Sequence, residues 1–446
     1  MLRTVSKAAA EDYLFVERSG VLDRLIAEGA LVGTRRIDHP LSRETGAALV
    51  LEHPALPFIS YPYEWSFPLL KAAALHHLRI QASCLENGVS FSDSSAYNVQ
   101  FVGTRPILID VLSLRRYRAN EIWIGYKQFC EQFLFPLLLR AYRGIAHNAW
   151  YRGAPEGIEA AALARLLPWY RHLQPGVLMH VDLPARLGHM AEREVRRRAA
   201  TGLGQGRLPR ARYLAMLNHL HAWIAGLRPS AIGREAWRTY AETNTYEERA
   251  RAEKQAFVGE FVGRTRPAMV WDLGCNTGAY AEAALAAGAG LVIGFDGDHG
   301  ALERAFALAQ SKRLDFLPLY QDLADPSPGL GWRQGERAGL AERATADAVL
   351  ALALVHHLVF ARNVPLAEAI DWVVSLAPSG IIEFVPKDDP TVRLLLATRE
   401  DIFTDYGFDA FRAAVQARAR LVREARLAGS GRVLIQYERP RTSSGG

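Results

Sequence analysis

Cysteine and long apolar runs are both scarce in this 446-residue chain. The three cysteines, Cys84, Cys130 and Cys275, lie far apart, so neither a disulfide framework nor a cysteine metal site has the spacing it needs. The longest apolar run of the first half, 133–139, contains Pro136 and is far shorter than the ~20 residues that span a membrane. Because residues 1–15 also lack an apolar signal core, the sequence predicts a soluble, cytoplasmic protein.

Lysine is rare as well. Of the 53 cationic residues only six are Lys, which leaves 47 Arg, and the formal net charge is +6. The arginines are spread over the whole chain, whereas a nucleic-acid footprint needs a clustered basic patch. We therefore expect a partner other than nucleic acid.

The length of the chain predicts several domains, because it exceeds what one compact core accommodates. Region 1–148 combines a helix at 67–88 with loop-rich segments, which indicates an α+β region. Apolar residues recur at helical spacing in region 149–234, which we expect to be a helical connection. Region 235–440 forms the third part, and the Ser/Gly-rich tail 441–446 is expected to be frayed.

Region 235–440 alternates apolar strand candidates with helical segments. Such alternation predicts an α/β fold, with a doubly wound, Rossmann-like parallel sheet and helices on both of its faces. The strand candidates are 269–273, 291–295, 316–320, 348–353, 380–385 and 433–438.

The most informative stretch is Asp-Leu-Gly-Cys-Asn-Thr-Gly, 272–278, which lies between the first strand candidate and an alanine-rich helix. A glycine turn at this place lets a ligand approach backbone N–H groups near a helix N-terminus. Asn276 tolerates the left-handed conformation that a middle glycine would supply. Asp296, 18 positions beyond Gly278, ends the second strand and can accept both hydroxyls of a ribose. Strand, turn, helix, strand and acid together predict a nucleoside-binding site.

Two phosphate-binding turns are excluded by the spacing of the glycines. A dinucleotide turn needs G-x-G-x-x-G, whereas Asn276 stands midway between Gly274 and Gly278 here. A P-loop needs G-K-[ST], which does not follow this turn. The carboxylate of Asp272 beside the turn would repel a pyrophosphate but suits an ammonium group. The pattern D-L-G-C-x-T-G resembles motif I of class I S-adenosylmethionine-dependent methyltransferases.

The resemblance implies S-adenosylmethionine as the cofactor and a role for each residue around it. Asp272 and the turn would hold the methionine part, and Asp296 would hold the ribose. Asp322, which follows the third strand, would receive the adenine amino group, although an acid there also suits a helix N-cap. The turn residues to which the resemblance extends are Gly274, Cys275, Asn276 and Gly278.

Polar residues follow the fourth and fifth strands, whose carboxyl ends face the ligand crevice in an open α/β sheet. His356 and His357 are candidates for a general base, and His356 is favoured because Leu358 and Val359 suggest that His357 begins a buried helix face. Glu383, in the proline-bracketed polar loop expected after the fifth strand, is a third candidate acid or base. The sequence leaves the choice among these three open. The structural alternative is that one histidine caps a helix or packs inside, and that Glu383 lies in a solvated loop. No metal is required.

The chain lacks the N/D-P-P-[YFW] signature of many amino-group methyltransferases after the fourth strand, which favours an oxygen acceptor. The expected reaction is a direct displacement, for which the protein mainly supplies alignment. Further phrases are similar to bacterial methyltransferases known as nodulation-protein-like. This resemblance covers most of the chain and leaves open which small molecule or glycan is the acceptor. The phrases are 59–65, 96–101, 237–254, 354–358, 363–366, 383–387 and 399–403.

A second pattern lies in the first region. The spacing Asp93-x4-Asn98, with Asp110 after an apolar run, resembles the catalytic loop and metal-binding Asp of kinase-like phosphotransferases. The resemblance implies Asp93 as the base, and Asn98 and Asp110 as Mg²⁺ ligands. No G-x-G-x-x-G loop precedes Asp93, and Val-Leu at 111–112 stands where Phe-Gly is usual. The alternative is a polar loop between a helix and a strand hairpin.

Four functions remain after these observations. The leading one is an S-adenosylmethionine-dependent methyltransferase whose N-terminal half binds the acceptor. The others are a bifunctional kinase-like methyltransferase, a nucleic-acid methyltransferase and a non-catalytic nucleoside-binding module. The sequence does not indicate an oligomeric state.

Overall fold

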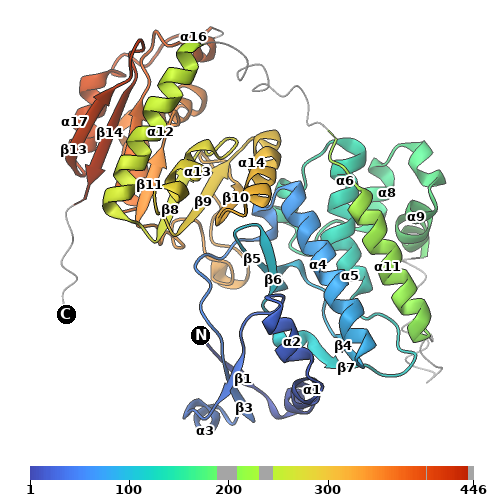
Figure 1. Ribbon diagram of the computed structural model, residues 1–446. Coiled ribbons are helices and arrows are strands. Elements are labelled where there is room, and N and C mark those ends of the chain that lie inside the picture. Colours follow the sequence, from blue (N-terminus) through green and yellow to red (C-terminus); the bar gives the residue numbers. More distant parts are fainter. Residues whose placement is uncertain (188–207, 231–244, 398, 440–446) are drawn as a thin grey trace. The chain divides into compact units, whose positions relative to one another are not determined.

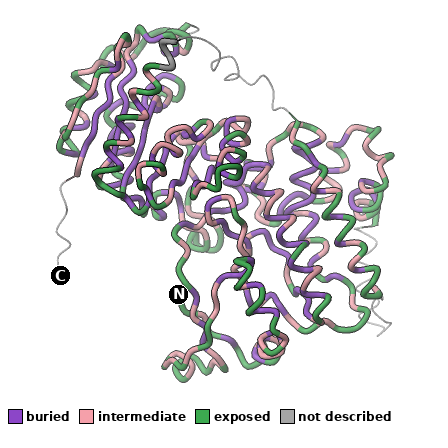
Figure 2. Tube along the Cα trace, in the orientation of Figure 1, coloured by how far each residue is buried: buried purple, intermediate pink, exposed green. Residues whose placement is uncertain are grey.

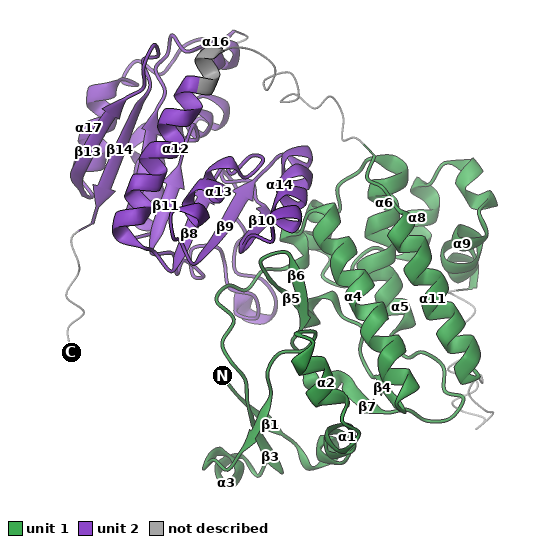
Figure 3. Ribbon diagram, in the orientation of Figure 1, with its two compact units in different colours: residues 1–234 green, residues 235–446 purple. Residues whose placement is uncertain are grey.

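The computed structural model describes residues 1–187, 208–230, 245–397 and 399–439 (Figure 1). The tail 441–446 and the first part of the family-like phrase 237–254 lie outside the described residues. Contacts divide the chain into two compact units, Met1–Arg234 and Glu235–Gly446 (Figure 3). The further division of the first unit at residue 148 stays a prediction.

Unit 1 begins with a small antiparallel sheet. In this sheet β3 (Leu49–Glu52) lies between β1 (Leu2–Val5) and β2 (Arg35–Ile37). The long helix α4 (Phe67–Glu86) follows, and its position agrees with the predicted helix to within two residues. Most of its aliphatic side chains are buried, so α4 forms a central part of the core of this unit.

Two strand pairs follow α4. The strand β4 (Val89–Phe91) pairs with β7 (Leu114–Arg116), and β5 (Val99–Val102) forms a hairpin with β6 (Arg105–Leu108). The loop 92–98 therefore connects β4 to the hairpin of β5 and β6. The segment after β6 then leads to β7, the partner of β4. The other described α-helices of unit 1 are α1 (Lys7–Arg18), α2 (Val21–Ala27), α3 (Leu41–Thr45), α5 (Tyr126–Phe129), α6 (Phe135–Arg143), α7 (Asn148–Gly153), α8 (Ala160–Leu166), α9 (Pro175–Val177) and α11 (Arg210–Gly226).

Unit 2 contains a seven-stranded sheet in the order β10-β9-β8-β11-β12-β14-β13. Its first five strands are parallel, whereas β14 runs antiparallel to both of its neighbours. The α/β fold expected for this region is therefore confirmed, with the correction that the parallel part ends at β12 and that β14 is antiparallel. The strands are β8 (Met269–Leu273), β9 (Leu291–Asp296), β10 (Phe316–Tyr320), β11 (Ala348–Ala351), β12 (Ser379–Phe384), β13 (Arg420–Arg426) and β14 (Val433–Glu438).

Strand β13 was not predicted, and its sequence shows why. Its residues alternate between exposed and half-buried positions, and the exposed ones include Arg420, Glu424 and Arg426. A charged strand of this kind is typical of a sheet edge, where charge discourages pairing with another chain. The apolar content that marked the other strands is therefore missing here.

Helices cover both faces of the sheet. On one face, Phe261 of α12 (Thr245–Thr265), Ala284 of α13 (Ala279–Ala286) and Leu302 of α14 (His299–Lys312) pack in one apolar cluster with Val270 and Val292 of the sheet. Figure 2 shows the buried residues running along the central strands of this unit. The connections from β8 and β9 run to one side of β8, whereas the connection from β11 to β12 runs to the other side. Because such connections are right-handed, α15 (Leu366–Ser375) in the β11–β12 connection covers the other face, where it packs with α17 (Phe408–Gln416). The last helix of the unit is α16 (Pro390–Leu396). None of the described helices combines the length and apolar character needed to cross a bilayer.

Candidate functional site

The candidate site lies where the order of the strands in the unit 2 sheet reverses, beside β8. Strand β8 has β9 on one side and β11 on the other, and the helical connections from these neighbours run apart. Ligands of open α/β sheets bind in the crevice outside the carboxyl ends of the strands at such a point. Asp272 pairs in register with Gly294 of β9 and Leu350 of β11, so it lies at the centre of this crevice.

The turn after β8 takes the backbone shape that its sequence predicts. Gly274, Asn276 and Gly278 have φ values of 81°, 48° and 87°, all in the left-handed region. A Cβ at Gly278 would lie 2.6 Å from Cε1 of Phe316, so close packing as well as backbone conformation requires glycine there. The backbone N–H groups of Gly274 and Cys275 donate to the carbonyl of Phe295, at 2.8 and 3.0 Å, which ties the turn to β9.

Asp272 is the residue of this crevice whose environment best fits a ligand contact. Its side chain is 1% exposed, and its Oδ2 has no hydrogen-bond partner among the described residues. Burial, and then the neighbouring charge of Asp296, raise the pKa of Asp272 from 3.8 to about 7. A buried polar atom without a partner is rare in folded proteins and requires an explanation. A ligand with a cationic hydrogen-bond donor would satisfy this oxygen.

Asp296 ends β9 and is oriented by the backbone. Its Oδ2 accepts from the N–H of Asn276 and its Oδ1 accepts from the N–H of Asp298, both at 2.8 Å. Burial raises the pKa of Asp296, while these backbone hydrogen bonds oppose the rise. The carboxylate is thereby held beside the glycine turn, where the sequence predicted a ribose contact.

Asp322 follows β10 and already has protein partners. Its Oδ2 forms an ion pair with Arg362, and its Oδ1 accepts from the N–H of Ala324 at 3.0 Å. Tyr320, at the end of β10, stacks on the ring of His299, which begins α14, with centroids 4.6 Å apart. An adenine amino group would therefore have to share the Asp322 carboxylate with Arg362, and the predicted role of Asp322 stays a prediction.

The two histidines differ in burial, and the difference is the reverse of the one expected from the sequence. His356 is 1% exposed, whereas His357 is half-buried and begins the π-helical turn His357–Ala361. Burial, followed by the charges of neighbouring cationic groups and His357, lowers the pKa of His356 to about 2, and burial lowers that of His357 to about 4. Neither ring nitrogen of His356 has a hydrogen-bond partner among the described residues. A neutral, unpaired imidazole can accept a hydrogen bond from a ligand hydroxyl.

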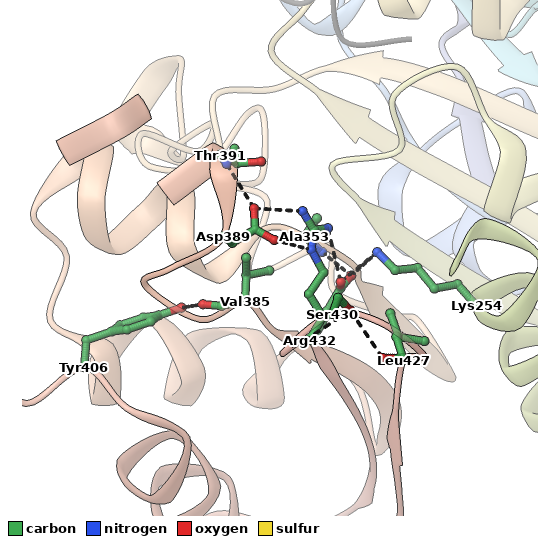
Figure 4. Close-up of polar contacts among 10 residues, drawn as sticks. Lys254, Ala353, Val385, Asp389, Thr391, Tyr406, Leu427, Ser430 and Arg432 are labelled. Atoms are coloured by element: carbon green, nitrogen blue, oxygen red, sulfur yellow. Dashed lines mark hydrogen bonds and ion pairs between the residues drawn. The ribbon is translucent and has the colours of Figure 1, made fainter. Parts of the chain in front are cut away.

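The expectation for Glu383 needs correction. It lies inside β12, in a fully buried position, and not in a solvated loop. Lys254 of α12 lies 2.6 Å from its Oε1, and Arg432, which precedes β14, lies 3.4 Å from the same atom. Figure 4 shows the side chains of Lys254 and Arg432 reaching this carboxylate from two different segments. Two cations compensate the carboxylate, which explains how a charged residue occupies a central strand.

Lys254, Arg432 and Tyr280 were missed as site residues. Tyr280 of α13 is half-buried, and burial followed by the charge of Glu383 raises its pKa, so the phenol lies in the same electrostatic environment. Lys254 appeared in the sequence only at the end of a family-like phrase. Its pairing with Glu383 had no signal in the sequence, because the two residues lie 129 positions apart.

The kinase-like residues of unit 1 are brought near one another. Oδ2 of Asp93 accepts from the side-chain amide of Asn98 at 3.0 Å, and the backbone N–H of Ile109 donates to the carbonyl of Asn98 at 2.8 Å. Asp110 forms an ion pair with Arg3 and accepts from the N–H of Leu112. Across the described parts of the chain, no three His, Cys, Asp or Glu side chains gather as a metal site would require.

One curated relative is similar over almost the whole chain. The nodulation protein NoeA of Rhizobium meliloti (strain 1021) is 46% identical over 445 residues, which cover 98% of this chain and 92% of that protein. No protein-family model matches the chain.

Solved structures match about half of the chain. Magnesium protoporphyrin IX methyltransferase from Synechocystis PCC 6803, with bound SAM, is 21% identical and covers 46% of this chain and 90% of its own, with a TM-score of 0.32. The N-methyltransferase NodS from Bradyrhizobium japonicum WM9 is 14% identical and covers 43% of this chain and 97% of its own, also with a TM-score of 0.32.

Proposed function

This chain belongs to the family of the nodulation protein NoeA, and we propose that it is an S-adenosylmethionine-dependent methyltransferase. The acceptor is an oxygen atom of a small molecule or glycan. The single observation that carries the proposal is the unpaired, buried Oδ2 of Asp272 at the switch point of a doubly wound sheet. A cationic ligand at this place removes the penalty of an unpaired buried carboxyl oxygen.

The cofactor is S-adenosylmethionine, and the residues of the crevice fit its parts. The Asp272 carboxylate binds the ammonium group of the methionine part, and the left-handed turn at 274–278 gives the ligand access to the backbone. Asp296 binds the ribose hydroxyls from the end of β9. When bound, the cofactor supplies an electrophilic methyl group.

The histidines contribute to the acceptor side of the reaction. We assign to His356 the hydrogen bond from the acceptor hydroxyl, because its ring is neutral and its nitrogens lack protein partners. A general base works best when its pKa is near the working pH. The low pKa of His356 therefore favours a role in orienting the hydroxyl over a role as the general base. His357 remains the alternative. The hydroxyl proton passes to solvent as the oxygen takes the methyl group, and orientation supplies much of the catalysis in a displacement of this kind.

The test is calorimetric titration of the protein with S-adenosylmethionine and S-adenosylhomocysteine, in parallel with Asp296→Ala. Micromolar binding that the variant loses supports the proposal and justifies a screen of hydroxylated acceptors with a labelled methyl donor. His356→Gln should then lower the transfer rate by about 10²-fold without changing cofactor affinity, because the acceptor hydroxyl loses its alignment. Failure of both ligands to bind the wild-type protein would remove the proposal.

The second candidate is a bifunctional enzyme whose unit 1 is kinase-like in shape. It is favoured by the order of helix α4, the strand pair, the loop that carries Asp93 and Asn98, and the hairpin that precedes Asp110. The ion pair of Asp110 with Arg3 weighs against it, because that carboxylate would have to exchange a cation partner for Mg²⁺. ATP turnover that Asp110→Ala abolishes would support this candidate.

A further inference from the structure

Three segments far apart in the sequence meet at the Glu383 carboxylate, and they carry Lys254, Ala353 and Arg432. Besides its contact with Oε1, Nζ of Lys254 lies 2.8 Å from Oε2. The backbone N–H of Ala353 donates to the same Oε2 at 2.9 Å. Both carboxylate oxygens therefore already accept hydrogen bonds from the protein, which leaves Glu383 poorly placed to take a proton from an acceptor.

Ala353 has an unusual backbone conformation. It lies two residues beyond the end of β11 and has a φ of 50°, in the left-handed region. This conformation is unfavourable for a residue with a Cβ, and it persists only where the surroundings fix it. The hydrogen bond to the buried carboxylate is charge-assisted, so it supplies such a constraint at this residue.

The chain from Ala353 leads directly to the histidines. A helical turn starts at Leu354, whose carbonyl accepts from the N–H of His357 at 2.9 Å. His356 lies inside that turn with helical backbone angles. The conformation of residue 353 therefore sets where the turn begins and where the imidazole of His356 lies.

The surrounding charges balance. Arg432 also forms two hydrogen bonds with Asp389, at 2.7 and 3.1 Å, so two cations and two anions make a neutral group. Figure 4 shows Asp389 and Arg432 side by side in this group. Buried charges require this pairing, and it leaves Oε2 of Glu383 in place to accept from the N–H of Ala353.

We propose that Glu383 is a positioning residue that acts on His356 through the backbone of Ala353. Lys254 and Arg432 pair with its carboxylate and hold it in place. The inference rests on the proposed function, because it gives the buried ion group a task in the methyl-transfer crevice. It also makes a claim about the ligand-free protein, which is testable separately from cofactor binding.

The experiment follows the Cε1–H resonance of His356 in the full-length protein labelled at histidine, with His356→Gln to identify the signal. The test variants are Glu383→Gln and the charge-balanced pair Lys254→Met with Glu383→Leu, each with and without Ala353→Gly. The paired variant replaces both members of a buried ion pair by apolar residues, so it retains a folded core even if the single variant does not. Glu424→Gln, in an exposed ion pair with Arg412, is the matched control.

Both test variants should move the His356 resonance, and Ala353→Gly should bring it back toward the wild-type position, because glycine adopts the left-handed conformation without a Cβ penalty. Glu424→Gln should leave the signal in place. The proposal is overturned if the resonance does not move, or if Ala353→Gly restores nothing. S-adenosylmethionine titration of the same samples separates the two claims. A wild-type protein that binds no cofactor but shows the predicted shift and recovery contradicts the proposed function alone.

Discussion

The two units differ in the hydrogen-bond partners of the acids at the ends of their strands. In unit 1, the carboxylates of Asp93 and Asp110 have partners within the protein, which are Asn98, Arg3 and backbone N–H groups. In unit 2, Asp272 is almost fully buried and keeps one oxygen unpaired. Similar sequence patterns thus lead to different conclusions. An acid with internal partners is explained by the fold, whereas a buried acid without one points to a ligand.

The largest effect is expected from Asp272→Asn. The amide keeps the shape of the side chain but loses the charge that pairs with the ammonium group. We expect S-adenosylmethionine to bind about 100-fold more weakly, in line with the 1.5–3 kcal/mol typical of a hydrogen bond to a charged group. Isothermal titration calorimetry measures this directly.

Asp315→Asn is the matched control for that experiment. Asp315 is an exposed acid that directly precedes β10, at the opposite end of the strand from the crevice. Cofactor affinity should stay at the wild-type value in this variant. Equal losses in both variants would mean that general charge, and not the unpaired carboxylate, attracts the cofactor.

The next effect is on pH dependence. Because burial raises the pKa of Asp272 to about 7, the carboxyl group of the free protein is protonated at lower pH and must lose a proton to bind an ammonium group. Affinity should therefore increase by roughly tenfold per pH unit as pH rises toward 7, then level off. The same raised pKa makes the ligand-free protein lose stability as pH rises from the unfolded-state value toward 7. Titrations between pH 5.5 and 8.5, about one and a half units on either side of this pKa, measure the dependence, and Asp272→Asn should abolish it.

The smallest effect is expected in unit 1, from Asp110→Ala. Asp110 caps the 3₁₀ turn Val111–Ser113 and pairs with a half-exposed Arg3, so its loss should lower the free energy of unfolding by about 1 kcal/mol. Chemical denaturation measures this, and cofactor binding in unit 2 should not change. Asp110→Asn, which keeps an acceptor for the cap, should lose less. Loss of ATP turnover without loss of stability would instead favour a kinase-like site.

The parts of unit 2 that were predictable from the sequence are local ones. The strands on either side of the turn at 272–278 are continuous apolar runs, and the glycines restrict the turn between them to few conformations. Asn276 was expected to accept a left-handed conformation, and it does. The strand spacing then places Asp296 at the same sheet edge as Asp272, because parallel neighbours end together.

Other features depend on contacts between distant residues. Glu383 was expected in a polar loop because nothing near it in sequence reveals its partners, which lie 129 and 49 positions away in Lys254 and Arg432. The same holds for the ion pair of Asp322 with Arg362, 40 positions apart. Tertiary pairing of charges overrides local polarity at such positions, so burial of a charged residue is hard to read from one sequence.

The most direct test of the central claim is titration of the wild-type protein with S-adenosylmethionine at pH 6 and pH 8, in two buffers of different ionisation enthalpy. The account predicts binding at both values, tighter at pH 8, with release of a proton at pH 6 that Asp272→Asn does not show. Binding without proton release would contradict the role given to Asp272. No binding of S-adenosylmethionine, together with binding of Mg-ATP, would contradict the methyltransferase assignment and direct attention to unit 1.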